Sequence, residues 1–211
     1  MVIAALVAYA ASASVALYAL ERGMRPLALV TKPLTTVLLL PIVGPPTSTL
    51  RELVWAGVIA SVAGDAALLG AGTVAFMIGV GCFLIAHAAY IAAFATVAVW
   101  SAASWAGVAL VAAATPVLVR ILWPRVAGLR GPVLAYAAAI SAMIVAAFST
   151  VGGALPAPAL AAAGAVLFYV SDAALAIHRF VRPLRHATLL SVGVYWLGQL
   201  GIALASRGAA P

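Results

Sequence analysis

Residues 73–99 read TVAFMIGVGCFLIAHAAYIAAFATVAV, an apolar run in which no residue carries a formal charge. A helix needs about 20 apolar residues to cross a hydrocarbon core of roughly 30 Å, so this run is long enough to span a bilayer. The rest of the chain is similar, because 67% of its 211 residues are hydrophobic and only 7% are charged, whereas soluble domains carry about 25% charged residues. The composition therefore predicts an integral membrane protein, and it excludes a soluble globular domain, a disordered chain and a nucleic-acid-binding protein.

Eight apolar runs, separated by charged residues or by Gly and Pro, predict a single transmembrane domain over residues 1–211. The expected spans are about 2–20, 27–43, 52–71, 73–99, 102–122, 132–152, 158–177 and 186–206. Residues 2–20 are expected to be a retained span, because no basic segment precedes them as in a signal peptide. No alternating strand pattern appears, so the predicted fold class is an all-α integral membrane bundle of about eight helices.

The basic residues fall mainly on one side of this eight-span topology. The loops that follow the odd-numbered spans hold Arg22, Arg25, Arg120, Arg125, Arg130, Arg179, Arg182 and Arg185, and the other side holds only Arg51 and Arg207. Removing the second span destroys this asymmetry. The positive-inside rule therefore predicts both termini outside the cytoplasm. The abundance of Arg, Ala and Val is typical of a GC-rich bacterial genome, so the inner (cell) membrane is the expected location.

Four ionisable side chains lie within the expected spans: Lys32, Asp65, His87 and Asp172. Each costs on the order of 2.5–3.5 kcal/mol to insert, so such residues usually face the interior of a bundle. In the predicted topology Lys32, Asp65 and Asp172 lie roughly 8–9 Å from the cytoplasmic end of their spans. We therefore expect a site between helices in the cytoplasmic half. The alternatives are that Lys32 extends to the membrane surface and that the two acids only join helices.

Other polar side chains share helix faces with these groups. His87 and Tyr90 are three residues apart on one span, and Tyr195 and Gln199 are four apart on another. For His87, Tyr90 and Tyr195 the alternative is a packing role, and for Ser171 it is a hydrogen bond to its own helix backbone.

Several of these residues stand in longer motifs. They are Thr31-Lys32-Pro33-Leu34, Gly64-Asp65 with Leu68, FMIGVGCFLIAHAAY over 76–90, GAVLFYVSDAALA over 164–176 followed by Arg179-Phe180, and Tyr195 with Gln199. In this order they resemble the motifs of the lysoplasmalogenase family, the YhhN-like membrane proteins. The resemblance runs from about Lys32 to Leu204, and residues 100–160 contribute no recognisable motif.

The resemblance implies hydrolysis of the vinyl-ether bond of lysoplasmalogens to a fatty aldehyde and glycerophosphoethanolamine or glycerophosphocholine. A vinyl ether is cleaved by protonation of its β-carbon and capture of the resulting oxocarbenium ion by water. Two carboxyl groups can divide the acid and base roles, as they do in glycoside hydrolases. Our hypothesis is that Asp65 and Asp172 are this pair, in an order that the sequence does not assign.

The other residues receive supporting roles in this hypothesis. Lys32 pairs with one carboxylate, and His87 is a proton relay or a hydrogen-bond donor. Ser171 and Tyr195 hold a water or the hemiacetal oxygen, and Arg179 contacts the lipid phosphate. Tyr90 and Gln199 are expected to line the substrate site.

A proton-coupled transporter of lipids or small molecules is the main alternative, because intramembrane Asp, Lys and His residues also mark proton pathways. An accessory membrane protein without a site of its own is the third candidate. Two Asp and one His can ligate a metal, but no His-x-x-x-His or Glu-x-x-His pair occurs, so neither a metal nor a cofactor is expected. The expected partners are the bilayer and a lysophospholipid, with no nucleic acid; the sequence does not indicate an oligomeric state.

Overall fold

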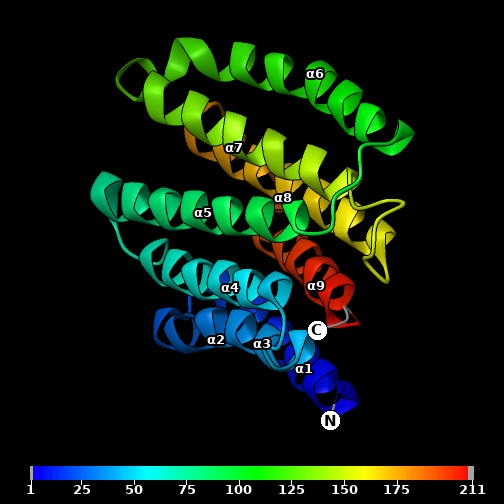
Figure 1. The fold of residues 1–211 in the computed structure, drawn as a ribbon. Helices are drawn as coiled ribbons and strands as arrows, with labels where there is room; N and C mark the ends of the chain where they lie inside the picture. Colours follow the sequence, from blue (N-terminus) through cyan, green and yellow to red (C-terminus); the bar gives the residue numbers. More distant parts are fainter. Residues whose placement is uncertain (1, 209–211) are drawn as a thin grey trace.

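The chain folds into a bundle of α-helices that run roughly side by side (Figure 1), and the computed structural model describes residues 2–208. The helices are α1 (Val2–Glu21), α2 (Arg25–Val37), α3 (Leu39–Val43), α4 (Thr49–Ala67), α5 (Gly72–Ala95), α6 (Ala102–Leu122), α7 (Arg130–Phe148), α8 (Pro158–Phe180) and α9 (Val194–Arg207). Two 3₁₀ turns, Trp123–Arg125 and Ala127–Leu129, join α6 to α7, and a π-helical turn, Leu189–Gly193, precedes α9. The predicted all-α membrane fold is confirmed.

Within residues 2–208, seven helical segments are long and apolar enough to cross a membrane, which makes the chain an integral membrane protein. They are α1, α2 together with α3, α5, α6 with its following turn, α7 with its preceding turn, α8, and α9 with its preceding turn. The eighth long helix, α4, carries Arg51, Glu52 and Asp65, and packs against α2, α5 and α9 in the same bundle. A crossing by α4, and with it the eight-span topology, remains a prediction from the charge pattern.

The region expected as one span over 27–43 forms two helices, α2 and α3, which meet at Leu38. Proline explains the interruption, because Pro41 has no N–H to donate to the Val37 carbonyl and its ring crowds that carbonyl. Pro33 is accommodated inside α2. The interruption lies one residue after the end of α2, the helix that carries Lys32.

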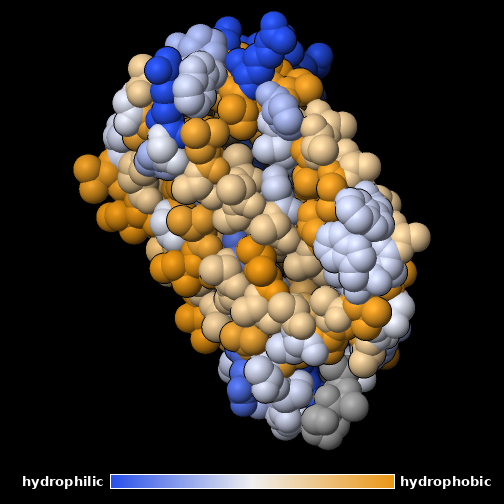
Figure 2. Space-filling model, turned by 45° about the horizontal axis from the view of Figure 1, so that its top comes forward, coloured by the Kyte–Doolittle hydropathy of each residue, from blue (hydrophilic) through white to orange (hydrophobic). Residues whose placement is uncertain are grey.

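The start of α1 and the end of α9 lie at the same end of the bundle (Figure 1). There the Arg207 guanidinium donates a 2.9 Å hydrogen bond to the carbonyl oxygen of Ile42, at the end of α3. The face shown in Figure 2 has hydrophilic residues at its two ends and mostly hydrophobic residues between them, as expected for a bilayer-spanning surface. Which end faces the cytoplasm remains a prediction from the positive-inside rule.

Glycine allows the closest helix contacts in the bundle. A Cβ atom on Gly164 of α8 would lie 2.6 Å from the carbonyl oxygen of Gly198 on α9, and a Cβ on Gly198 would lie 2.7 Å from the carbonyl oxygen of Gly164. On α4, Gly64 faces the ring of Phe83 and Gly57 faces the ring of Tyr90. Small residues commonly serve this purpose in membrane helices, where close backbone approach drives association. These contacts bring α9 against α8 and fix two aromatic rings of α5 against α4.

We expect Gly164→Ala to lower the free energy of unfolding by about 1–3 kcal/mol, the usual cost of overpacking, because its methyl group would push α9 away. The measurement is thermal unfolding of the purified protein in detergent. Gly81→Ala on α5 is the matched control, since a Cβ there meets nothing within 4 Å and alanine is the better helix former. Equal stability of the two variants would contradict the packing argument.

Candidate active site

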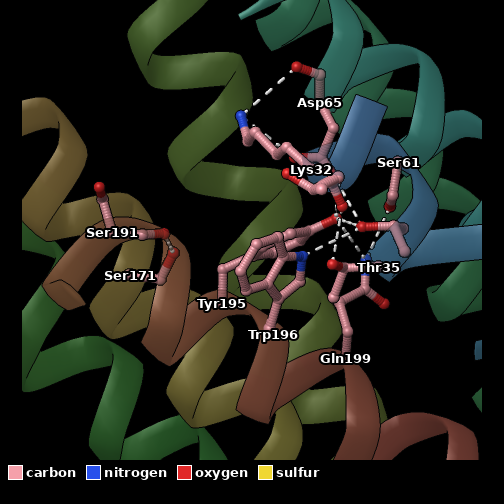
Figure 3. A network of polar contacts seen from close by, with 11 residues as sticks. Lys32, Thr35, Ser61, Asp65, Ser171, Ser191, Tyr195, Trp196 and Gln199 are labelled. Carbon is pink, nitrogen blue, oxygen red and sulfur yellow. Dashed lines mark hydrogen bonds and ion pairs between the residues drawn. The ribbon is translucent and has the colours of Figure 1, made fainter. Parts of the chain in front are cut away.

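Asp65 of α4 is at the centre of a buried polar network (Figure 3). Its Oδ1 atom lies 3.3 Å from Nζ of Lys32 on α2, and its Oδ2 atom accepts hydrogen bonds from Thr36 at 2.5 Å and from the Tyr195 hydroxyl at 3.1 Å. Lys32 is only 5% exposed and Asp65 only 1%. The lysine therefore does not extend to the membrane surface. It neutralises a carboxylate inside the bundle, and its Nζ also donates to the Asp65 carbonyl at 3.4 Å.

The network continues along one face of α9. The Gln199 amide donates to Ser61 at 2.8 Å and to the Tyr195 hydroxyl at 3.3 Å, while its carbonyl oxygen accepts from the Tyr90 hydroxyl at 2.6 Å. The Trp196 indole donates to Thr36 at 3.2 Å. Each of these side chains has a hydrogen-bond partner, as polar groups within a bilayer require. The network joins α2, α4, α5 and α9.

Asp172 of α8 lies in a second, smaller cluster. Its Oδ2 atom accepts a 2.7 Å hydrogen bond from the hydroxyl of Tyr136 on α7, and lies 3.8 Å from Nε2 of His87 on α5. The Asp172 side chain is 16% exposed, against 1% for Asp65. Asp172 is therefore the more accessible of the two carboxylates.

His87 is fully buried and its two ring nitrogens have different surroundings. Nδ1 lies 2.6 Å from the carbonyl oxygen of Phe83, one turn earlier on α5. Nε2 faces Asp172 and has no hydrogen-bond partner within residues 2–208. The imidazole packs edge-on against Tyr136 and at a tilt against Phe168, with ring centroids 5.1 and 4.7 Å apart. Contacts with these two rings fix the orientation of the imidazole plane.

A pocket lies among α5, α6, α7 and α8, and Asp172 lines it. Most of its lining is apolar, and the residues include Leu68, Phe76, Met77, Val80, Phe83, Leu118, Val119, Leu122, Leu129, Pro132, Val133, Ala137, Ile140, Ala173, Leu175, Ala176 and Phe180. Its polar members are Tyr136, Tyr169 and Asp172. Arg179, at the end of α8, is exposed and holds its guanidinium 5.0 Å from the ring centre of Phe76. A cationic side chain thus stands beside an apolar pocket that contains one carboxylate.

The two carboxylates expected as a pair belong to these separate clusters. Within residues 2–208 no hydrogen bond or ion pair joins Asp65 to Asp172. Three aromatic rings connect the clusters instead: Tyr195, Phe83 and Phe168 make mutual edge-on contacts with centroids 5.2 to 6.1 Å apart. Asp65 does not line the pocket.

The remaining expected site residues divide in the same way. Tyr90, Tyr195 and Gln199 belong to the Asp65 network. Ser171 points elsewhere, because its hydroxyl donates a 2.8 Å hydrogen bond to the carbonyl of Ser191 in the π-helical turn (Figure 3). The π-helical turn interrupts the regular hydrogen-bond pattern of an α-helix. The Ser171 hydroxyl therefore supplies a hydrogen-bond donor to a backbone carbonyl within this turn.

Four participants were missed from the sequence: Thr36, Ser61, Trp196 and Tyr136. Thr36 lies one helical turn after Lys32 and Ser61 one turn before Asp65, so helical spacing from the charged residues was an available signal. Trp196 follows Tyr195 directly. Tyr136 had no such signal, because it stands alone in a region without a recognisable motif. Within residues 2–208, no three His, Cys, Asp or Glu side chains converge on one point.

One comparison with known proteins gives a match. The family model of YhhN proteins matches residues 27–206, which contain all the site residues described above. No curated protein and no solved structure matches the chain.

We expect Lys32→Met to lower the free energy of unfolding by about 3–5 kcal/mol, because it leaves the Asp65 carboxylate buried without its cation. Lys32→Met combined with Asp65→Asn should recover part of this loss, since the double variant has no buried charge at this place. Thermal unfolding in detergent measures both variants. A double variant less stable than Lys32→Met alone would show that the ion pair does not dominate the network.

Proposed function

The chain belongs to the YhhN family, and from this membership and the pocket geometry we propose that it is a lysoplasmalogenase. It hydrolyses the vinyl-ether bond of a single-chain alkenyl glycerophospholipid, releasing a fatty aldehyde and glycerophosphoethanolamine or glycerophosphocholine. The reaction requires no cofactor, because water and one proton donor suffice.

One observation carries this proposal: a partly accessible carboxylate, Asp172, lines an otherwise largely apolar pocket between four membrane helices. An apolar pocket with few polar groups suits a hydrocarbon chain, and the polar groups fix the position of the bond to be cleaved. Arg179 stands beside Phe76 at the end of the α8 helix. Its guanidinium suits a phosphate group, to which it can donate two parallel hydrogen bonds.

Asp172 acts as the general acid in this mechanism. Its Oδ2 already accepts the Tyr136 hydroxyl, which leaves Oδ1 to carry the proton. Transfer of that proton to the β-carbon breaks the carbon–carbon π bond and gives an oxocarbenium ion. Water then adds to the α-carbon and loses a proton, forming a hemiacetal. The bond from the hemiacetal carbon to the glycerol oxygen then breaks. That oxygen takes up a proton while the hemiacetal hydroxyl gives one up, and the aldehyde is released.

Asp65 has a different part in this proposal from the equal partnership expected from the sequence. Its oxygens are occupied by Lys32, Thr36 and Tyr195. The Tyr195 ring in turn packs on Phe83 and Phe168. Asp65 thereby acts as a positioning residue, which holds the aromatic rings that support the pocket and His87.

Purified protein in detergent should release aldehyde from an alkenyl glycerophosphoethanolamine, and Asp172→Asn should lower kcat by about 10²-fold or more, the usual contribution of a general acid. The saturated-ether analogue should be inert, because it has no double bond to protonate. Asp65→Asn should lose activity together with thermal stability, whereas Asp172→Asn should lose activity alone. A folded wild-type protein that releases no aldehyde would contradict the proposal and favour the transporter alternative.

Arg179→Gln should raise KM about tenfold with little change in kcat, as expected when about 1.4 kcal/mol of phosphate binding is lost. Arg182→Gln is the matched control, since it removes the same charge from the loop after α8. Equal KM values for the two variants would remove Arg179 from substrate binding.

A further inference from the structure

In the part of the chain that the structure describes, one ring nitrogen of His87 is buried without a hydrogen-bond partner, beside the carboxylate that lines the pocket. The residue has no exposed surface, and Nε2 makes no hydrogen bond within residues 2–208. Buried polar atoms are almost always paired, and an exception in a native structure needs an explanation. The Asp65 network shows the ordinary outcome in this same protein, because its members are paired with one another.

The hydrogen bond on the other side of the ring decides which nitrogen can accept a proton. The Phe83 carbonyl can only accept, so Nδ1, 2.6 Å away, must carry the hydrogen. In the neutral ring Nε2 therefore has a free lone pair, and Nε2 lies 3.8 Å from Oδ2 of Asp172. That distance is too long for a direct hydrogen bond.

We propose that Nε2 of His87 holds the hydrolytic water against Asp172 and accepts its proton, an inference that rests on the lysoplasmalogenase activity proposed above. A water at about 2.8 Å from each atom forms a triangle on the 3.8 Å base between Nε2 and Oδ2. The Asp172 side chain lines the pocket, and in this proposal the water lies on the pocket side of the two atoms, next to the vinyl ether.

The proton balance closes in this arrangement. Asp172 gives its proton to the β-carbon and becomes a carboxylate. The water oxygen bonds to the α-carbon while His87 takes one of the water protons at Nε2. The resulting imidazolium and carboxylate lie beside each other, and loss of the Nε2 proton to solvent water with uptake of a proton at Oδ1 restores both groups for the next turnover. No oxidant, metal or other reactant is needed.

A held water also solves a chemical problem that this substrate presents. A lysolipid has a free hydroxyl on the glycerol carbon adjacent to the carbon that bears the ether oxygen. That hydroxyl can capture the oxocarbenium ion to give a five-membered cyclic acetal, in which no aldehyde is released. A water bound next to the α-carbon has the advantage of proximity over this internal competitor. His87 therefore determines the product as well as the rate.

His87→Gln tests the proposal, because the glutamine carbonyl oxygen can still accept a hydrogen bond from the water but cannot take its proton. We expect kcat for aldehyde release to fall about 10²-fold or more, with KM changed less than about twofold because His87 does not bind the lipid. The variant should also form the cyclic acetal, detected by mass spectrometry. His178→Gln is the matched control, since His178 lies on the exposed end of α8.

Turnover in D₂O separates the two chemical steps. In His87→Gln the ion forms but is captured slowly, so loss of a β-proton returns it to substrate, and the recovered vinyl ether should contain deuterium at the β-carbon. If His87 has a purely structural role, the substitution should slow protonation and capture alike. The recovered substrate would then contain no deuterium, and no cyclic acetal would form. That outcome, or aldehyde release by His87→Gln equal to that of the control, overturns the proposal.

A second experiment uses the wild-type enzyme alone, so its result does not depend on whether His87→Gln folds. Turnover in dilute methanol should yield aldehyde alone, because the held water captures the ion. A mixed methyl acetal that retains the glycerophospho group would show capture by free solvent and would overturn the proposal. If the wild type releases no aldehyde at all, the proposed function itself fails. If the wild type is active and His87→Gln is equally active, only the role of His87 fails, so the two results can be distinguished.

Discussion

The buried ion pair between Lys32 and Asp65 is the constraint on which the rest of the bundle depends. A charge within the membrane is tolerated only when a partner and hydrogen bonds replace water. Lys32 supplies the opposite charge, and Thr36 and Tyr195 supply the hydrogen bonds. These partners come from α2 and α9, so neutralising one carboxylate fixes both helices against α4.

The same requirement reaches the pocket through aromatic contacts. The hydroxyl of Tyr195 is held by Asp65, and its ring then packs edge-on against Phe83 and Phe168. Phe83 provides the carbonyl that binds Nδ1 of His87, and Phe168 packs on the imidazole. The Asp65 network, in which the polar side chains have hydrogen-bond partners, thus supports the neighbouring Asp172 cluster, in which Nε2 of His87 has no partner within residues 2–208. Reactive sites commonly have this construction, with a rigid outer shell around a few exposed polar groups.

The irregular backbone of the bundle lies near these groups. Pro41 separates α2 from α3 close to Lys32 and Thr36, and the π-helical turn Leu189–Gly193 immediately precedes the α9 face that carries Tyr195. A π-helical turn shifts the register of the residues that follow it, and such turns are frequent at functional sites. Ser171 bonds to a carbonyl of this turn. Its contribution is therefore to local backbone geometry in α9.

The sequence by itself determined the membrane environment, the all-α fold, the family resemblance and the ionisable residues within the apolar runs. Each of these follows from composition, run length or local motif. Only the tertiary structure decided that Lys32 joins Asp65, that Tyr136 and His87 face Asp172, and that the two carboxylates lie in separate clusters. The physical reason is that the pairing of polar side chains depends on how each helix is rotated about its axis and on how closely neighbouring helices pack. Helices such as α1, α5 and α7 are apolar on almost all sides, so no hydrophobic periodicity marks their inner faces. In α2 the buried face is instead the polar one, with Thr31, Lys32 and Thr36. Close contacts such as Gly164 with Gly198 set the geometry instead, and in an Ala- and Gly-rich sequence they cannot be distinguished from the many small residues around them.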